Sequence, residues 1–184
     1  RVESARIELE RIARLAGEVP TQEAAMLRLM VAILYRALPI EGGQKRAVTA
    51  WGQWWRADRL PAEVMNYLAA HHDRFDLFDH EKPFLQVSDL QANGTSGLMS
   101  LVADVPPKSP YFTTRAGDQL ERLSAAEAAR WLVHCQAFDP SGIKTGAVGD
   151  DRVKGGKGYP IGTGWSGNLG LILVEGATLK DTLL

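Results

Sequence analysis

Apolar residues recur at helical spacing through the first forty residues of the chain. Hydrophobic positions three or four residues apart between Val2 and Leu15 predict a first helix that ends near Gly17. A denser apolar run follows and leaves little room for a polar face. It predicts a core helix over residues 21–38 with Thr21 as its N-cap.

Two further helices are predicted over about residues 46–59 and 61–72. The first carries Trp51, Trp54 and Trp55, which share one face because they stand three and four positions apart. Packing of these rings against the core is the favoured interpretation. An aromatic binding platform is the alternative.

The second half of the chain mixes one clear helix with short strand patterns and long loops. Ser124 and Glu127 have the spacing of a capping box and open a helix that runs to about residue 138. Residues 83–87 and 169–174 are strand candidates. We therefore predict an α+β fold: a helix-rich mixed globular domain with short strands and long glycine-rich loops.

Composition and charge are those of an ordinary soluble protein. The 184 residues carry a formal net charge of −1, so any nucleic-acid site must be local or shared with partner subunits. Cys135 is the only cysteine, which allows no disulfide within the chain and favours a reducing, cytoplasmic location. The apolar run over residues 24–34 is too short to span a bilayer and contains Arg28, so no membrane partner is expected.

Residues 153–170 form the most distinctive segment, a glycine-rich stretch with two lysines and two aromatic rings. Glycines let a backbone approach a ligand closely, and lysines beside exposed N–H groups suit a phosphate. Residues 162–167 match G-x-G-x-x-G, but the run that follows them looks like a strand where a dinucleotide site needs a helix. A P-loop is excluded by Asp151 and Gly158, because that motif needs glycine and Ser or Thr there.

Metal and nucleophile chemistry have weaker support. His71, His72 and Asp73 form the only cluster with the chemistry of an HD-type phosphohydrolase, which would be metal-dependent. A polar helix end running into a turn is the favoured interpretation of the same residues. His134 and Cys135 are adjacent on a helix and point to different faces, which is a poor arrangement for a base and a nucleophile. No catalytic residue, metal ligand or cofactor is therefore predicted.

Two loops combine cationic and aromatic character, residues 106–117 and 144–164. Between Lys144 and Tyr159 there are four cations and two carboxylates. A modest local excess of this kind positions a phosphate backbone without driving bulk binding. A solvent-exposed loop that contacts nothing is the alternative.

Four segments together carry a resemblance to a known family. Residues 15–29, 74–87 and 127–139 look like segments of the CasA large subunit of type I-E CRISPR Cascade complexes, and the Lys-Gly-Gly-Lys-Gly-Tyr-Pro-Ile-Gly-Thr-Gly-Trp run is similar to one branch of that family. The family's opening segment, the remainder of its globular domain and its C-terminal four-helix bundle are missing. We therefore expect residues 1–184 to be part of one N-terminal globular domain.

The resemblance implies a non-enzymatic role. A subunit of this family recognises the protospacer-adjacent motif of double-stranded target DNA, promotes duplex opening and recruits the helicase-nuclease that cuts. Guide RNA and the other Cascade subunits are the further partners implied. Two other classes stay open: a metal-dependent phosphohydrolase using His71, His72 and Asp73, and a structural scaffold whose glycine loop docks a protein partner.

The same resemblance assigns residues to two nucleic-acid contacts. The family's glycine loop approaches the motif duplex from the minor groove, whose degenerate code suits a bare backbone with lysine. It maps to Lys154, Gly155, Gly156, Lys157 and Gly158. A second loop, close to the guide RNA, maps to Lys108, Tyr111, Phe112, Thr113, Thr114 and Arg115.

Overall fold

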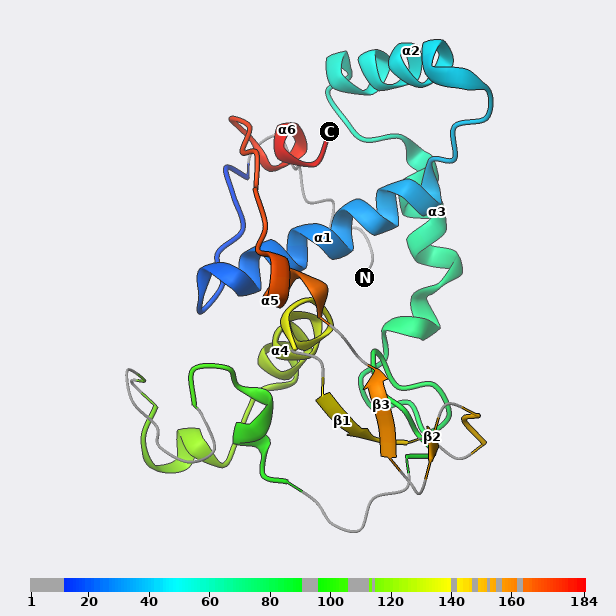
Figure 1. The fold of residues 1–184 in the computed structure, drawn as a ribbon. Coiled ribbons are helices and arrows are strands. Elements are labelled where there is room, and N and C mark those ends of the chain that lie inside the picture. The colour runs from blue at the N-terminus through cyan, green and yellow to red at the C-terminus, as the bar shows by residue number, and fades with distance from the viewer. Residues whose placement is uncertain are drawn as a thin grey trace. The chain divides into compact units, whose positions relative to one another are not determined.

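The computed structural model describes residues 12–90, 96–105, 113, 115–139, 142–146, 149–151, 153–154, 157–161 and 164–184. The backbone forms two compact units. The first combines the described residues up to His72 with Ile172–Leu184, and the second lies within Asp73–Leu171. The α-helices and strands of both units are labelled in Figure 1. The prediction of a helix-rich protein is confirmed.

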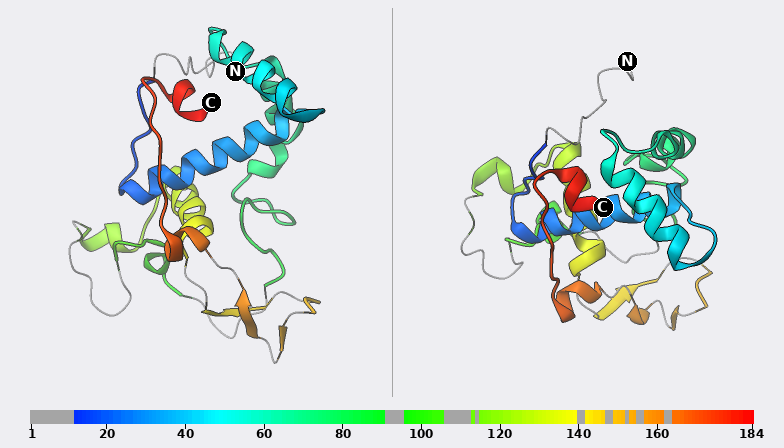
Figure 2. Two further views of the ribbon diagram at one scale, coloured as in Figure 1. Left: turned by 45° about the horizontal axis from the view of Figure 1, so that its top comes forward. Right: turned by 90° about the horizontal axis from the view of Figure 1, so that it is seen from above.

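Helix α1 (Pro20–Ala37) is the centre of the first unit, and α3 (Ala62–Ala70) and α6 (Leu179–Leu183) pack against it (Figures 1 and 2). Their apolar side chains form one buried cluster, which confirms that the second predicted helix is a core helix. The buried members of this cluster are Leu27, Leu34, Val64, Leu179 and Leu183.

The start of α1 differs from the prediction that Thr21 is the N-cap. Pro20 occupies the first turn and Val19 is the N-cap, with no side-chain hydrogen bond to the helix from Val19. Proline suits this place because it lacks an N–H and its φ is already helical. A polar contact instead forms across the helix start, where the Glu18 N–H donates to Gln22 Oε1 at 3.0 Å.

Residues 12–17 are not helical, so the predicted first helix is wrong over its described part. The Leu179 N–H donates to the Ile12 carbonyl at 2.7 Å, and Ile12 and Leu15 pack on the apolar cluster. These residues thus partly bury their apolar side chains without forming a helix. Residues 1–11, where most of that helix was predicted, lie outside the described residues.

Helix α6 follows directly on Thr178. Thr178 and Asp181 form a complete capping box at its N-terminus. Lys180 is 5% exposed, and its Nζ donates to the backbone carbonyls of Trp55 and Ala57. These carbonyls end helix α2 (Gly43–Arg56), so the buried ammonium group replaces the donors that the helix end lacks.

The second unit is built on α4 (Ala125–Phe138), with η4 (Leu98–Leu101) and α5 (Trp165–Leu169) packed against it. Ser124 Oγ accepts the Glu127 N–H at 3.2 Å, which confirms the predicted N-cap. The short helices η3 (His72–Phe75) and η5 (Gly117–Leu120) precede and follow η4 in sequence. Among the described residues of this unit, the buried apolar ones are Val102, Val105, Trp131, Val133 and Ala137.

The strands of the structure do not lie at the two apolar runs that were predicted to be strands. Strands β1 (Gly142–Thr145), β2 (Val153–Lys154) and β3 (Lys157–Ile161) form one antiparallel sheet in the order β1-β3-β2. Residues 83–87 are turn structure, and residues 170–176 have no regular structure, so both strand candidates are wrong. An apolar run indicates that a segment can be buried, but it does not indicate whether a neighbouring strand is available to pair with it.

His134 is buried on α4, where its ring centroid lies 5.3 Å from Trp131 and 5.0 Å from Phe138. Desolvation lowers the pKa of His134 below its ordinary value of 6.5. The unfolded chain therefore binds this proton more readily than the folded one. The contribution of His134 to stability is complete above pH 6.5 and is lost as the pH falls below that value.

A denaturation series should show this effect. We expect the urea midpoint to fall as the pH is lowered from about 7.5 to about 5.5, and His134→Gln to remove part of that fall. An equally steep fall in the variant would show that His134 does not contribute.

Candidate nucleic-acid interface

The small sheet places Lys154 and Lys157, the lysines predicted to contact DNA, opposite each other. In the β2–β3 register Lys154 pairs with Lys157 and Val153 pairs with Gly158. Gly155 and Gly156, which connect the two lysines, lie outside the described residues. In the β1–β3 register Thr145 pairs with Lys157, so Thr145, Lys157 and Lys154 occupy one row across the three strands.

A second row crosses the sheet beside the first. Lys144, Gly158 and Val153 occupy neighbouring positions on β1, β3 and β2. Three lysines of this segment are therefore brought to one end of a three-stranded sheet by backbone pairing alone. The sequence indicated a cationic loop, but it did not indicate that Lys144 occupies the row next to that of Lys154 and Lys157, because this depends on the register of the β1–β3 pairing.

The other end of the sheet returns to α4. Gly142 of β1 pairs with Ile161 of β3, with an irregularity in the register between Gly142 and Lys144. Just beyond these strand ends, the Gly164 N–H donates to the Asp139 carbonyl at 2.6 Å. The segment that carries the lysines thus leaves the C-terminal end of α4 and returns to it.

The elements on either side of the G-x-G-x-x-G sequence also differ from the prediction. A strand, β3, precedes it, and the short helix α5 begins inside it, so the predicted strand-like continuation is wrong. A dinucleotide fold is still not present in the described residues, because the sheet is antiparallel and α5 has only five residues. Gly164 and Gly167 instead lie against the backbone of α4 at Phe138 and Asp139.

The second predicted loop is described only at Thr113 and Arg115. Arg115 pairs through Nη2 with Glu127 at 2.7 Å and lies 3.8 Å through Nε from Asp104. Its side chain is 11% exposed. Thr113 Oγ1 donates to Asp104 Oδ2 at 3.3 Å and accepts the Arg115 N–H. Arg115 therefore fixes the end of this loop to the first turn of α4.

Lys108, Tyr111, Phe112 and Thr114 lie outside the described residues. Glu127 fulfils only one half of the predicted capping box by the contacts described: its N–H binds Ser124, while its carboxylate binds Arg115. The sequence pattern identified the correct residue at the helix start, but the ion pair with Arg115 depends on the fold.

His71 of the histidine–aspartate cluster has structural partners. His71 Nδ1 lies 2.9 Å from the Tyr67 carbonyl, and the two rings stack with centroids 4.2 Å apart. Nearby, Asp79 accepts the N–H groups of Lys82 and Glu81, and these bonds lower the pKa of its carboxyl group. Among the described residues, no three His, Cys, Asp or Glu side chains are placed to hold a metal ion. The described part of the chain thus provides no ligand set for the phosphohydrolase hypothesis.

The tryptophan face of α2 is only partly covered by the rest of the first unit. No residue of α2 is buried, and Trp51 and Trp55 are 42% and 41% exposed. Their rings stack with centroids 5.3 Å apart, and Trp51 Nε1 donates to the Leu184 carbonyl. The favoured prediction of core packing is therefore wrong for Trp51 and Trp55, whereas Trp54 is half-buried. Helical spacing shows that the rings share a face but not what that face meets.

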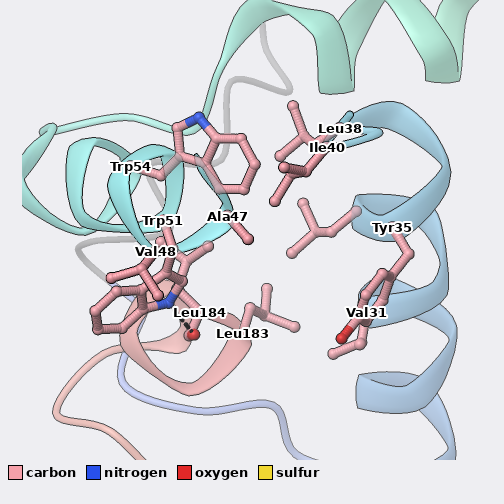
Figure 3. A pocket seen from close by; sticks show the side chains of 11 residues that line it. Val31, Tyr35, Leu38, Ile40, Ala47, Val48, Trp51, Trp54, Leu183 and Leu184 are labelled. Carbon is pink, nitrogen blue, oxygen red and sulfur yellow. Dashed lines mark hydrogen bonds between the residues drawn. The ribbon is translucent and has the colours of Figure 1, made fainter. Parts of the chain in front are cut away.

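An apolar cavity of about 360 Å³ lies between α1, α2 and α6, beside these tryptophans (Figure 3). Its lining is apolar or aromatic throughout and belongs entirely to the first unit. The lining residues are Val31, Leu34, Tyr35, Leu38, Ile40, Ala47, Val48, Trp51, Trp54, Leu183 and Leu184.

The sequence also matches a family model, that of CRISPR-associated protein Cse1, over residues 4–184. The chain belongs to the Cse1 family. Cse1 from Thermobifida fusca is 50% identical, with a TM-score of 0.74 over 93% of this chain. Cse1 from Acidimicrobium ferrooxidans is 37% identical, with a TM-score of 0.62 over 92% of this chain. The predicted resemblance is confirmed.

The Cse1 relatives are much longer than this chain. It covers 32% of the Thermobifida fusca chain and 30% of the Acidimicrobium ferrooxidans chain. A curated relative, CasA/Cse1 of Thermus thermophilus, is 34% identical over 134 residues, which are 71% of this chain and 26% of the relative. No helix among the described residues is long and apolar enough to cross a membrane.

Proposed function

We propose that this chain forms the part of a Cse1-family large subunit that contacts double-stranded target DNA. In this proposal the subunit is non-catalytic and cytoplasmic and works within an RNA-guided type I-E CRISPR Cascade complex for antiviral defence. It recognises the protospacer-adjacent motif, aids duplex opening and recruits the helicase-nuclease. The observation that supports the DNA contact is the register that sets Lys154 opposite Lys157 in a chain of this family.

The pairing of two like charges favours an anionic ligand. Positions directly opposite each other in an antiparallel pair share one face of the sheet, and like charges there disfavour the pairing. A phosphate group between such positions removes the repulsion and gains two charge-assisted contacts. Because the net charge of the chain is −1, binding of this kind depends on the local site and not on bulk attraction.

The glycines between the two lysines suit the minor groove. Gly155 and Gly156 carry no side chains, and the minor groove of B-DNA is only about 6 Å wide. Contacts to phosphates position a protein on DNA, whereas the degenerate edge pattern of the minor groove permits tolerant recognition. A short lysine-glycine-glycine-lysine sequence therefore fits a motif that is read loosely.

The test uses the complete subunit assembled in its complex. We expect Lys154→Ala combined with Lys157→Ala to weaken binding to motif-bearing duplex. Each lost phosphate contact should flatten the plot of log affinity against log salt by about 0.9, so the slope should change by up to about 1.8. Gly156→Leu should weaken binding without this change in slope, since it removes space and no charge.

A matched control removes two exposed lysines elsewhere. Lys45→Ala combined with Lys82→Ala gives the same change in net charge, and neither residue belongs to the sheet. This control should leave the salt slope unchanged. Equal slopes for the control and for the Lys154 and Lys157 variant would contradict the assignment of the DNA contact.

We further propose that residues 108–115 lie near the guide RNA. The support is the anchoring of Arg115 to Glu127 and Asp104, because a loop fixed at one end loses less conformational entropy on binding. Cross-linking of guide RNA to the assembled subunit, followed by peptide mapping, tests this assignment. Cross-links confined to other segments would contradict it.

A further inference from the structure

Two glycines of the G-x-G-x-x-G sequence lie so close to α4 that no side chain fits. A Cβ built on Gly164 would lie 2.5 Å from the Asp139 N atom and 2.6 Å from the Asp139 carbonyl oxygen. A Cβ built on Gly167 would lie 2.5 Å from the Phe138 carbonyl oxygen. All of these neighbours are backbone atoms, which cannot turn away as a flexible side chain can.

The close approach is accompanied by hydrogen bonds. The Gly164 N–H donates to the Asp139 carbonyl, and the Asp139 N–H donates to the Cys135 carbonyl at 2.9 Å. The Gly167 N–H donates back to the Gly164 carbonyl at 2.8 Å. Gly164 is buried, and Ser166 between the two glycines is 1% exposed. The start of α5 is thereby joined to the last turn of α4.

This arrangement is not shared by every glycine of the unit. A Cβ on Gly97 would meet no atom within 4 Å, and the φ of Gly97 is −65°, which any residue can adopt. Space at Gly97 is therefore not what requires glycine there. At Gly164 and Gly167 the requirement comes from contact with α4.

We propose that Gly164 and Gly167 are positioning residues for the DNA contact. They hold the root of the β1-β3-β2 sheet against the end of α4, and this fixes where the paired lysines at its other end are presented. The inference rests on the proposed function of Lys154 and Lys157. A sheet fixed at its root loses less freedom when it binds a duplex than one attached by a free linker.

The effect of adding a methyl group at Gly164 follows from the short distances to the α4 backbone. Gly164→Ala forces a gap between α5 and α4, because a contact of 2.5 Å must lengthen beyond 3.0 Å. The bond from the Gly164 N–H to Asp139 then weakens, and the root of the sheet shifts. Lys154 and Lys157 remain present and charged, but they no longer meet phosphates in the same register.

The test compares Gly164→Ala and Gly167→Ala with Gly97→Ala in the complete subunit within its complex. The first two variants should bind motif-bearing duplex more weakly. Their slope of log affinity against log salt should flatten by up to about 1.8, as it should in the double lysine variant. Gly97→Ala should match the unaltered protein in both. Unchanged affinity and slope in Gly164→Ala and Gly167→Ala would overturn the inference.

Hydrogen exchange separates a shifted root from general unfolding. In Gly164→Ala the amides of Gly167 and residue 164 should exchange at least tenfold faster, while amides in the middle of α4 keep their protection. Faster exchange along all of α4 would indicate a purely structural role and overturn the inference. If both glycine variants fail to fold, the amide exchange rate of Gly164 in the unaltered protein is measured instead. Exchange as fast as in an unstructured peptide would overturn the inference. Protection of the Gly164 amide equal to that of the Asp139 amide would support it.

The exchange measurement also distinguishes the two proposals. If the lysine variant leaves the salt slope unchanged, the proposed DNA contact fails. A localised loss of protection in Gly164→Ala would then still show that the glycines fix the root of the sheet. If the lysine variant flattens the slope and the glycine variants do not, only the positioning role fails.

Discussion

Replacing Trp131 by alanine should destabilise the second unit by about 3–5 kcal/mol. Trp131 has no exposed surface and is the largest side chain buried on α4. Its removal loses the transfer free energy of an indole ring and leaves a cavity among rigid neighbours. Urea denaturation followed by circular dichroism measures the loss of free energy as a change in the midpoint.

Two further substitutions show whether the ring or its N–H matters. Trp131→Phe keeps most of the apolar surface and removes an indole N–H that has no hydrogen-bond partner among the described residues, so it should cost much less than alanine. Phe78→Ala, in the same unit, removes a ring that is 73% exposed and should change stability by about 0.5 kcal/mol or less. A loss at Phe78 as large as that at Trp131 would contradict the assignment of the core.

Replacing Leu179 by alanine should destabilise the first unit by about 2–5 kcal/mol. Leu179 is 1% exposed and belongs to the apolar cluster formed by α1, α3 and α6. Its N–H also joins α6 to the Ile12 carbonyl, so a shift of α6 would disturb this hydrogen bond as well. The same denaturation measurement, with its transition assigned to the first unit by limited proteolysis, gives the change in free energy.

Ile172→Ala is the matched control for this experiment. It removes an aliphatic side chain from the same unit, but Ile172 is 93% exposed. We expect a change within about 0.5 kcal/mol. The result would count against the described core if Ile172→Ala and Leu179→Ala had equal effects.

Local signals predicted the helices better than they predicted contacts between elements. The predicted helix over residues 21–38 is α1, displaced by one residue at each end, because apolar periodicity and the proline at its start act within one turn. Ser124 was predicted as an N-cap for the same reason. The strand candidate at residues 83–87 failed because the Phe84 N–H binds the Asp76 carbonyl, eight residues back, and this bond closes a turn.

The candidate site divides in the same way. The sequence located the lysines and glycines of the loop, and the resemblance to a family suggested their ligand. The sequence could not predict that Lys154 stands opposite Lys157 or that Lys144 occupies the neighbouring row, since both depend on strand register. The close approach of Gly164 and Gly167 to α4 could not be predicted from the sequence either. A glycine that accommodates a ligand and one that accommodates a neighbouring helix have the same sequence signature.

The meeting of Asp139 with Gly164 has an evolutionary consequence. A stretch of chain whose two ends touch can change in length or composition without moving the elements that precede and follow it. The entropy of closing such a stretch grows only slowly, by about 0.6 kcal/mol for each doubling of its length. Residues 140–163 can therefore be replaced by a stretch of different length or composition without displacing α4 or α5. Under the proposed function, relatives that share α4 and α5 would change the DNA sequences they accept by replacing residues 140–163 alone.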